Sequence, residues 1–259
     1  MLQLYIMNLV QTLILSIVEG VTEFLPISST GHLILVSDFL EITQTEFVKS
    51  FEIIIQLGAI LSVVVIYFKK LVKNIDLWKQ IIIAFLPSAI FGALFYKLIK
   101  IYLIGNSLVV VLSLILGGIV MILFEKYHKE KEKDLNLKHY LLIGFFQVIS
   151  MIPGVSRAFA TIFGGMIVGM SRKKATEFSF FLAIPTMLGA TVLDLIKTDI
   201  SVWTNSNFVT LSLGFLASFV TAYVVVKWLI KFVQTHDFVG FGWYRIVLAT
   251  LFAFYILGM

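Results

Sequence analysis

Six apolar runs divide this chain, and each approaches the length needed to cross a lipid bilayer. They cover residues 53–68, 81–96, 103–124, 178–193, 208–226 and 243–258. A transmembrane helix needs about 20 mainly apolar residues, and Lys, Trp or Tyr at its ends extend the reach of a shorter run. Only 14% of the 259 residues are charged, against about a quarter in a soluble domain. The runs predict an all-α polytopic membrane protein in which residues 1–259 form a single membrane domain.

Two further apolar segments, 2–40 and 140–170, are each interrupted by a polar cluster. The first cluster, residues 19–32, has the sequence EGVTEFLPISSTGH, and the second, residues 150–161, has the sequence SMIPGVSRAFAT. Irregular backbone is tolerated at membrane depth only where it is buried in protein or lines a water-filled cavity. We therefore expect each segment to be a re-entrant helix–loop–helix hairpin. Because residues 1–18 lack a positive n-region and a small-residue cleavage site, we expect them to be retained rather than cleaved as a signal peptide.

The two halves of the chain repeat one order of elements. A shift of 127 residues aligns Pro26 with Pro153 and Ser29 with Ser156. Each half, about 1–126 and 127–259, then consists of one hairpin followed by three spans. Because three is an odd number, the halves have inverted topology, and such repeats place their broken helices face to face near the bilayer midplane.

Basic residues indicate the orientation of the chain in the membrane. Lysine and arginine concentrate in four segments, 69–79, 126–138, 172–174 and 227–231. The positive-inside rule places all four in the cytoplasm. Residues 38–49, residues 197–207 and both termini then lie outside, and the first hairpin enters from outside. This distribution accounts for the net charge of +5 without a nucleic-acid partner.

The first polar cluster contains two carboxylates on one helical face. Glu19 and Glu23 are four residues apart, which places their side chains side by side on a helix. Two adjacent carboxylates repel unless a cation or a shared proton separates them. Mg²⁺ and Ca²⁺ both prefer oxygen ligands, so the pair is a candidate divalent-cation site. The alternative is that one glutamate is a protonated, hydrogen-bonded structural residue.

Hydroxyl groups and a histidine follow the carboxylates. Pro26 stops a helix, and Ser28, Ser29 and Thr30 come at the predicted start of the next one, where backbone N–H groups bind anions. A plain helix cap is the alternative for any of these hydroxyls. His32 is a candidate catalytic residue. Ser29 is a candidate nucleophile with His32 as its base; alternatively, His32 activates water or attacks phosphorus itself.

The second cluster adds a hydroxyl and a fixed positive charge. Ser156 and Arg157 follow the breaker Pro153. An arginine inside the membrane is costly unless it meets an anion, and its planar fork suits phosphate. The alternative partner is Glu19 or Glu23 in a structural ion pair. Together the two clusters supply the groups that phosphoryl transfer requires.

Both clusters resemble the signature motifs of the bacterial undecaprenyl-diphosphate phosphatases, also known as UppP, BacA or bacitracin-resistance proteins. The first motif is EGVTEFLPISSTGH at 19–32, and the second is PGVSR at 153–157 ending in Thr161. The similarity also covers residues 51–58 and the pair Tyr244 and Arg245. One departure is that Ala158 and Phe159 stand where the family commonly has Ser and Gly.

The resemblance implies hydrolysis of undecaprenyl diphosphate to undecaprenyl phosphate and inorganic phosphate, which recycles the lipid carrier of cell-wall synthesis. It further implies a divalent cation (Mg²⁺ or Ca²⁺), membrane lipids as neighbours, and a site opening to the outer side of the bacterial plasma membrane. The oligomeric state is left open between a monomer and a homodimer. The implied catalytic residues are Glu23, Ser29, His32 and Arg157, and the implied phosphate-binding residues are Ser28, Thr30, Ser156, Arg157 and Thr161. A competing hypothesis is a transporter or polyprenyl-phosphate flippase, since inverted repeats with broken helices are typical of secondary transporters.

Overall fold

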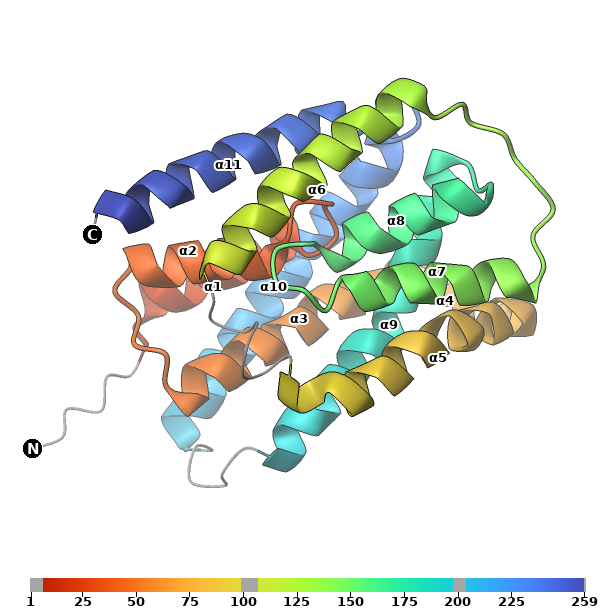
Figure 1. Cartoon of the computed structure of the whole chain (residues 1–259). Helices are drawn as coiled ribbons and strands as arrows, with labels where there is room; N and C mark the ends of the chain where they lie inside the picture. Colours follow the sequence, from red (N-terminus) through yellow and green to blue (C-terminus); the bar gives the residue numbers. More distant parts are fainter. Residues whose placement is uncertain (1–6, 99–106, 198–203, 259) are drawn as a thin grey trace, which may run out of the picture.

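The computed structural model describes residues 7–98, 107–197 and 204–258. These residues form eleven α-helices and no strand (Figure 1). Parts of three predicted segments lie outside the described residues: 2–6 of the first hairpin, 103–106 of the third apolar run and 198–203 of the second outer loop.

Long helices occupy all six predicted apolar runs. They are α3 (Glu46–Ile66), α5 (Ile75–Leu98), α6 (Ser107–Tyr127), α9 (Arg172–Lys197), α10 (Asn205–Phe232) and α11 (Val239–Gly258). The first five are long and apolar enough to cross a membrane. This confirms the prediction of an all-helical, polytopic membrane protein.

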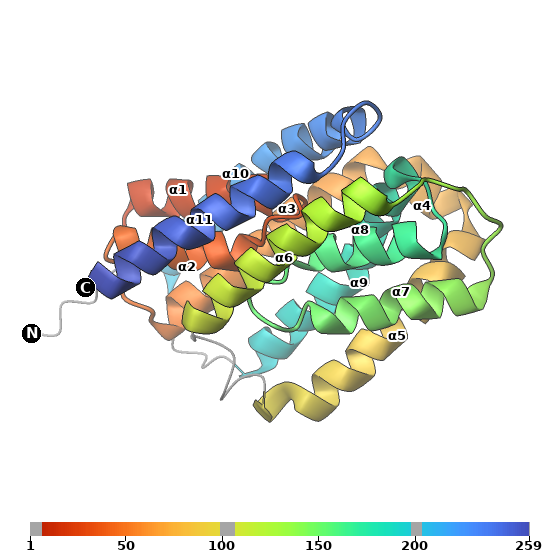
Figure 2. The same ribbon diagram turned by 45° about the horizontal axis from the view of Figure 1, so that its top comes forward.

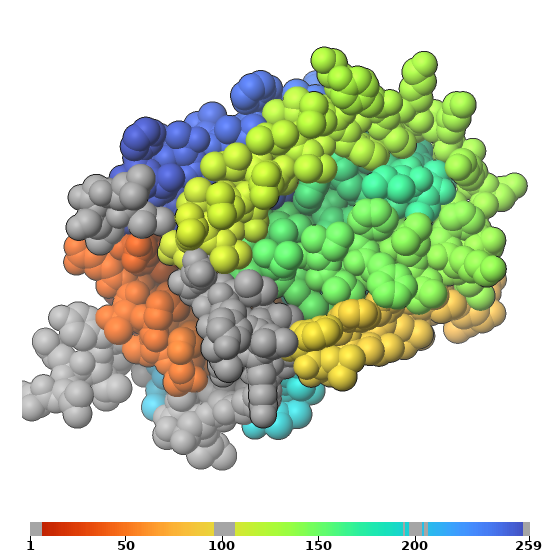
Figure 3. All heavy atoms as spheres, viewed as in Figure 1, coloured from red at the N-terminus to blue at the C-terminus, as the bar shows by residue number. Residues whose placement is uncertain are grey.

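The outer faces of these helices are apolar. On α6, which crosses the face seen in Figure 3, a stripe of exposed side chains follows the helical repeat: Leu108, Leu112, Leu116, Val120 and Leu123. In water such a stripe would have to be covered, whereas in a bilayer it meets lipid tails of the same polarity.

Each predicted hairpin is a pair of short helices separated by a break. The first pair is α1 (Leu9–Thr22) and α2 (Ser29–Phe39), and the second is α7 (Leu137–Ile149) and α8 (Arg157–Val168). The arms contact each other within each pair, and α1 packs on α10 while α7 packs on α5 (Figure 2). The predicted positions of both breaks are confirmed. One short helix, α4 (Phe68–Lys73), is not among the predicted elements.

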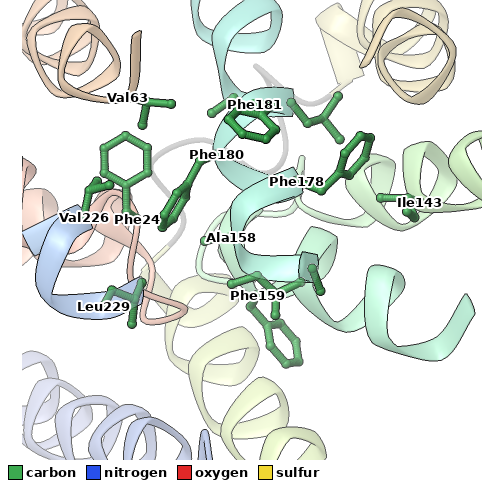
Figure 4. Packing of buried hydrophobic residues seen from close by; sticks show 14 of the residues in the cluster. Phe24, Val63, Ile143, Ala158, Phe159, Phe178, Phe180, Phe181, Val226 and Leu229 are labelled. Atoms are coloured by element: carbon green, nitrogen blue, oxygen red, sulfur yellow. The ribbon is translucent and has the colours of Figure 1, made fainter. Parts of the chain in front are cut away.

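One apolar core holds the two breaks together. Phe24, from the first break, packs edge-on against Phe180 of α9, with ring centroids 5.1 Å apart. Ala158 and Phe159, at the start of α8, belong to the same buried cluster (Figure 4). The two residues that depart from the family pattern therefore have a packing role, and α9 joins segments that are more than a hundred residues apart in the chain.

The four basic segments lie at one end of the helical bundle, on the right in Figure 1. Three ion pairs of 2.7 Å stabilise this end: Arg172–Glu125, Lys70–Glu177 and Lys174–Glu132. Glu125, whose side chain is almost fully buried, also accepts a hydrogen bond from the backbone N–H of Phe238 at the α10–α11 turn. The segments that the charge pattern assigns to one side of the membrane are thus neighbours in space.

Candidate active site

Both breaks end on a serine with an unusual backbone conformation. Ser28 has φ 73° and Ser156 has φ 76°, a region that costs a non-glycine residue about 1–3 kcal/mol. Each side chain caps the following helix: Ser28 accepts from the N–H of Gly31 and Ser156 from that of Phe159. The two serines are therefore helix caps, which the alternative interpretation allowed for Ser28. They also correspond to each other in geometry, whereas the shift of 127 residues aligned Ser29 with Ser156, so the repeats differ by one residue at this point.

A buried ion pair joins the two breaks. Arg157 Nη2 donates to Glu23 Oε1 at 2.8 Å, and the side chains of Arg157 and Glu23 are only 8% and 4% exposed. The other terminal nitrogen of Arg157 donates to the carbonyl and the hydroxyl oxygens of Ser179 on α9, at 2.8 and 3.2 Å. Removing one partner of such a buried pair costs about 3–5 kcal/mol, because the remaining charge stays in a poorly solvated place. The alternative partner proposed for Arg157 is thus present, and it is Glu23.

Ser29 belongs to the same cluster. Its hydroxyl donates to Glu23 Oε2 at 2.6 Å, so both oxygens of that carboxylate are occupied, one by Arg157 and one by Ser29. A serine hydroxyl bonded to a carboxylate is the arrangement of a nucleophile beside a proton acceptor. The Ser29 hydroxyl therefore bonds to Glu23 and not to His32, its candidate base in the sequence.

Two charged groups in the cluster have unpartnered polar atoms. Glu19 is fully buried on α1, and neither of its carboxylate oxygens has a hydrogen-bond partner. Arg157 Nε is likewise buried and unpartnered. A lone buried carboxylate is strongly unfavourable, so Glu19 fits a bound cation or a proton, and the free Nε fits an anion.

The two carboxylates fit a divalent cation whose remaining ligands are water and substrate oxygens. Glu19 and Glu23 supply oxygen donors, as Mg²⁺ and Ca²⁺ prefer, and Mg²⁺ is often held by one or two carboxylates together with water and substrate phosphates. Across the described residues, no group of three or more acidic, histidine or cysteine side chains forms a ready metal cage.

His32 is held from both ends of its ring. Its Nδ1 lies 2.8 Å from the backbone carbonyl oxygen of Ser28, and its Nε2 lies 2.7 Å from the hydroxyl of Tyr244 on α11. His32 is 7% exposed. The family resemblance includes Tyr244 but implies no role for it.

The remaining two predicted phosphate-binding residues are Thr30 and Thr161. Thr30 is exposed on the first turn of α2. Thr161 is buried, and its hydroxyl lies 2.8 Å from the carbonyl oxygen of Arg157 and 2.7 Å from the hydroxyl of Ser179. Because Ser179 also accepts from Arg157, Thr161 supports the arginine from behind.

Arg245 is, with Tyr244, a residue of the site to which the sequence assigns no role. It is fully buried on α11, and each of its three nitrogens donates to backbone carbonyls. The acceptors are Pro26 in the first break, Gly154 and Val155 in the second, and Ser113 and Leu114 on α6. One guanidinium therefore holds both breaks in place. The feature of the sequence that could have indicated a role for Arg245 is its position inside an apolar span, where an arginine is rare unless it has a function.

The fold and the site define a polytopic membrane protein whose buried polar centre forms where two broken helices meet. A family model described as "Bacitracin resistance protein BacA" matches residues 12–251. The chain belongs to this family, which confirms the resemblance drawn from the two motifs.

Relatives of similar length share about half of its residues. Undecaprenyl-diphosphatase of Aquifex aeolicus is 52% identical over 252 residues, covering 95% of this chain and 98% of that protein. Undecaprenyl-diphosphatase of Sulfurihydrogenibium sp. is 49% identical over 256 residues, covering 95% and 98%. The protein of the same name from Wolinella succinogenes is 46% identical over 256 residues, covering 96% and 99%.

Proposed function

We propose that this protein is an undecaprenyl-diphosphatase that hydrolyses undecaprenyl diphosphate to undecaprenyl phosphate and inorganic phosphate. Relatives with that name are 46–52% identical over nearly its whole length. The observation that carries the proposal is the cluster of Glu23, Ser29 and Arg157, which unites the two motifs. The product is the lipid carrier that cell-wall synthesis reuses.

The test is phosphate release by the purified protein in detergent, with undecaprenyl diphosphate as substrate. Hydrolysis that is lost in Arg157→Lys supports the proposal. The competing transporter or flippase hypothesis draws on the same broken helices, but a detergent micelle offers no second compartment. Absence of phosphate release from well-folded wild-type protein would favour that competing class.

Arg157 is proposed to bind the diphosphate. Its Nε is free and buried, and charge-assisted bonds to phosphate are among the strong hydrogen bonds in proteins. The N-termini of α2 and α8, at Ser29 and Arg157, add backbone N–H groups that favour an anion in the same place.

Ser29 is proposed as the nucleophile, with Glu23 as the acceptor of its proton. In this step the Ser29 oxygen forms a bond to the terminal phosphorus, the bond from that phosphorus to the bridging oxygen breaks, and the hydroxyl proton moves to Glu23. Water then attacks the phosphorus, the bond from phosphorus to the Ser29 oxygen breaks, a proton of the water returns to that oxygen, and Glu23 releases its proton to the solvent with the departing inorganic phosphate. The 2.6 Å hydrogen bond supports this route over one in which His32 is the base for Ser29.

A rapid quench with substrate labelled in the terminal phosphate tests the route. It predicts a labelled phosphoserine at position 29 that disappears in Ser29→Ala. Full burst activity of Ser29→Ala, together with an inactive His32→Ala, would instead support attack by water or by His32.

A divalent cation is proposed to bind at Glu19 and Glu23. Bound there, it would supply positive charge that neutralises the diphosphate. Chelation with EDTA should abolish phosphate release, and added Mg²⁺ or Ca²⁺ should restore it in the wild type but poorly in Glu19→Gln. Identical metal dependence in the two proteins would assign Glu19 a structural role.

The two halves are proposed to be inverted repeats. The helix caps Ser28 and Ser156 share nearly the same positive φ, and the packing of α1 on α10 matches that of α7 on α5. The basic segments gather at one end of the bundle, which supports a cytoplasmic position for that end and an outward-opening site.

Orientation is testable by labelling, because the chain contains no cysteine. A single cysteine at Thr43 should react with a membrane-impermeant maleimide added to intact cells, and one at Lys131 should react only after lysis. The reverse pattern would invert the topology.

A further inference from the structure

Helix α11 presents two consecutive polar residues to the site. Arg245 donates to carbonyls of both breaks, including that of Pro26, and Tyr244, the residue before it, contacts His32. Because the guanidinium fixes α11 against the loop that leads into α2, the phenol of Tyr244 has a defined position relative to the imidazole. The two rings are parallel to within 4°, with centroids 5.6 Å apart.

The partners of His32 specify which nitrogen carries the proton. A backbone carbonyl can only accept, so the Nδ1 that faces the Ser28 carbonyl oxygen at 2.8 Å is the protonated nitrogen. In the neutral ring Nε2 then has the lone pair, and the hydroxyl of Tyr244 donates to it across 2.7 Å. Two hydrogen bonds at opposite ends hold the ring in one orientation and one tautomer.

The exposures of the two residues show that Tyr244 lies between His32 and the outside of the bundle. His32 is 7% exposed, whereas Tyr244 is 45% exposed. The phenol therefore covers Nε2, the nitrogen with the basic lone pair. Arg245, the charged residue next to Tyr244 on α11, bonds to backbone carbonyls rather than to the imidazole.

We propose that Tyr244 is a positioning residue for the phosphatase reaction: it holds His32 as the neutral Nδ1–H tautomer, whose Nδ1–H bonds to the carbonyl of Ser28, the residue before the proposed nucleophile Ser29. The inference rests on the proposed function and deepens it by assigning a role to the last helix of the chain.

The first test is a ¹⁵N spectrum of histidine in the full-length protein in detergent. The chain has four histidines, so replacement of His128, His139 and His236 by glutamine leaves only His32. The expected wild-type spectrum at neutral pH shows a protonated Nδ1 and a hydrogen-bonded, unprotonated Nε2. In Tyr244→Phe the Nε2 signal should move towards that of a free lone pair.

Tyr255→Phe is the matched control, because Tyr255 is a partly exposed tyrosine on the same helix, and it should leave the spectrum unchanged. A wild-type ring protonated at Nε2, or a Tyr244→Phe spectrum identical to that of the wild type, would overturn the inference. The wild-type spectrum alone decides the tautomer, so the test does not depend on the folding of the variant.

The second test is kinetic. Tyr244→Phe keeps the stacked ring and loses one neutral hydrogen bond, so kcat should fall roughly tenfold with little change in KM. Tyr255→Phe should match the wild type. Wild-type kcat in Tyr244→Phe would refute the inference while the phosphatase assignment stands. A wild type that releases no phosphate would refute the assignment, and the spectrum would still decide the link between Tyr244 and His32.

Discussion

Replacing Arg245 by lysine tests whether one side chain holds the two breaks together. The substitution keeps the positive charge and changes only the number and geometry of the donors. Arginine offers five N–H groups in a planar fork, and a lysine ammonium offers three. In the structure these donors serve five carbonyls, those of Pro26, Ser113, Leu114, Gly154 and Val155.

The size of the stability loss follows from the hydrogen bonds that lysine cannot make. At least two of the five hydrogen bonds of Arg245 must be lost in Arg245→Lys, because an ammonium has only three donors. A hydrogen bond to a charged group contributes about 1.5–3 kcal/mol, so the variant should be destabilised by about 3–6 kcal/mol. Total stabilities of protein domains are about 5–15 kcal/mol, so this loss is a large fraction.

Activity should fall together with stability. Three of the carbonyls held by Arg245, those of Pro26, Gly154 and Val155, belong to the breaks that lead to Ser29 and Arg157. A displacement of about 1 Å in catalytic groups can reduce turnover on the order of a hundredfold. We expect phosphate release by Arg245→Lys to fall by about that factor even at temperatures where the variant is folded.

Thermal unfolding in detergent, followed by the intrinsic fluorescence of the four tryptophans, measures the stability change. Val247→Leu is the control, because Val247 lies two residues further along the same helix and is 56% exposed. It should unfold at the wild-type temperature. If Arg245→Lys unfolds with the wild type and retains its turnover, the carbonyl contacts of Arg245 do not hold the site, and the reasoning is refuted.

Three further predictions follow from the same cluster. A Cβ at Gly117 would meet the guanidinium of Arg245, whereas one at Gly240 would meet nothing within 4 Å. In the same unfolding assay Gly117→Ala should therefore lower stability by about 1–3 kcal/mol, and Gly240→Ala should be neutral. Equal unfolding temperatures of the two variants would contradict this geometry. Arg157→Lys should lose at least about a hundredfold in kcat/KM, because one ammonium cannot replace a fork that serves Glu23, Ser179 and a phosphate; near-normal turnover would argue against the phosphate role. Glu19→Gln should unfold no earlier than the wild type, because it removes an unpartnered buried charge, yet it should release less phosphate. A less stable but fully active variant would show that Glu19 is structural.

The sequence was sufficient to predict the helices and the places where they break. Apolar runs must form helices in a bilayer, because no other single segment satisfies its own backbone hydrogen bonds there. Pro26 and Pro153, each followed by small polar residues, end one helix and begin another, and the structure confirms both breaks. The candidates in both motifs follow from the cost of polar groups in apolar sequence.

The pairing within the site was decided by tertiary structure. Arg157 and Glu23 are 134 residues apart, and Tyr244 and His32 are 212 apart. Local sequence does not show which residues so far apart will meet. It therefore offered both Glu19 and Glu23 as partners of Arg157, and the structure selects Glu23. The sequence makes His32 a candidate base for Ser29, but the folded break directs the Ser29 hydroxyl to Glu23.

Arg245 shows most clearly what sequence by itself could not determine. The sequence shows an arginine in an apolar span and no acidic residue near it along the chain. Its partners are backbone carbonyls, as far away as Pro26, 219 residues earlier. Every residue has a carbonyl, so a bond to one leaves no pattern in the sequence. Only the packing of α11 against α6 and the two breaks brings those carbonyls to the guanidinium.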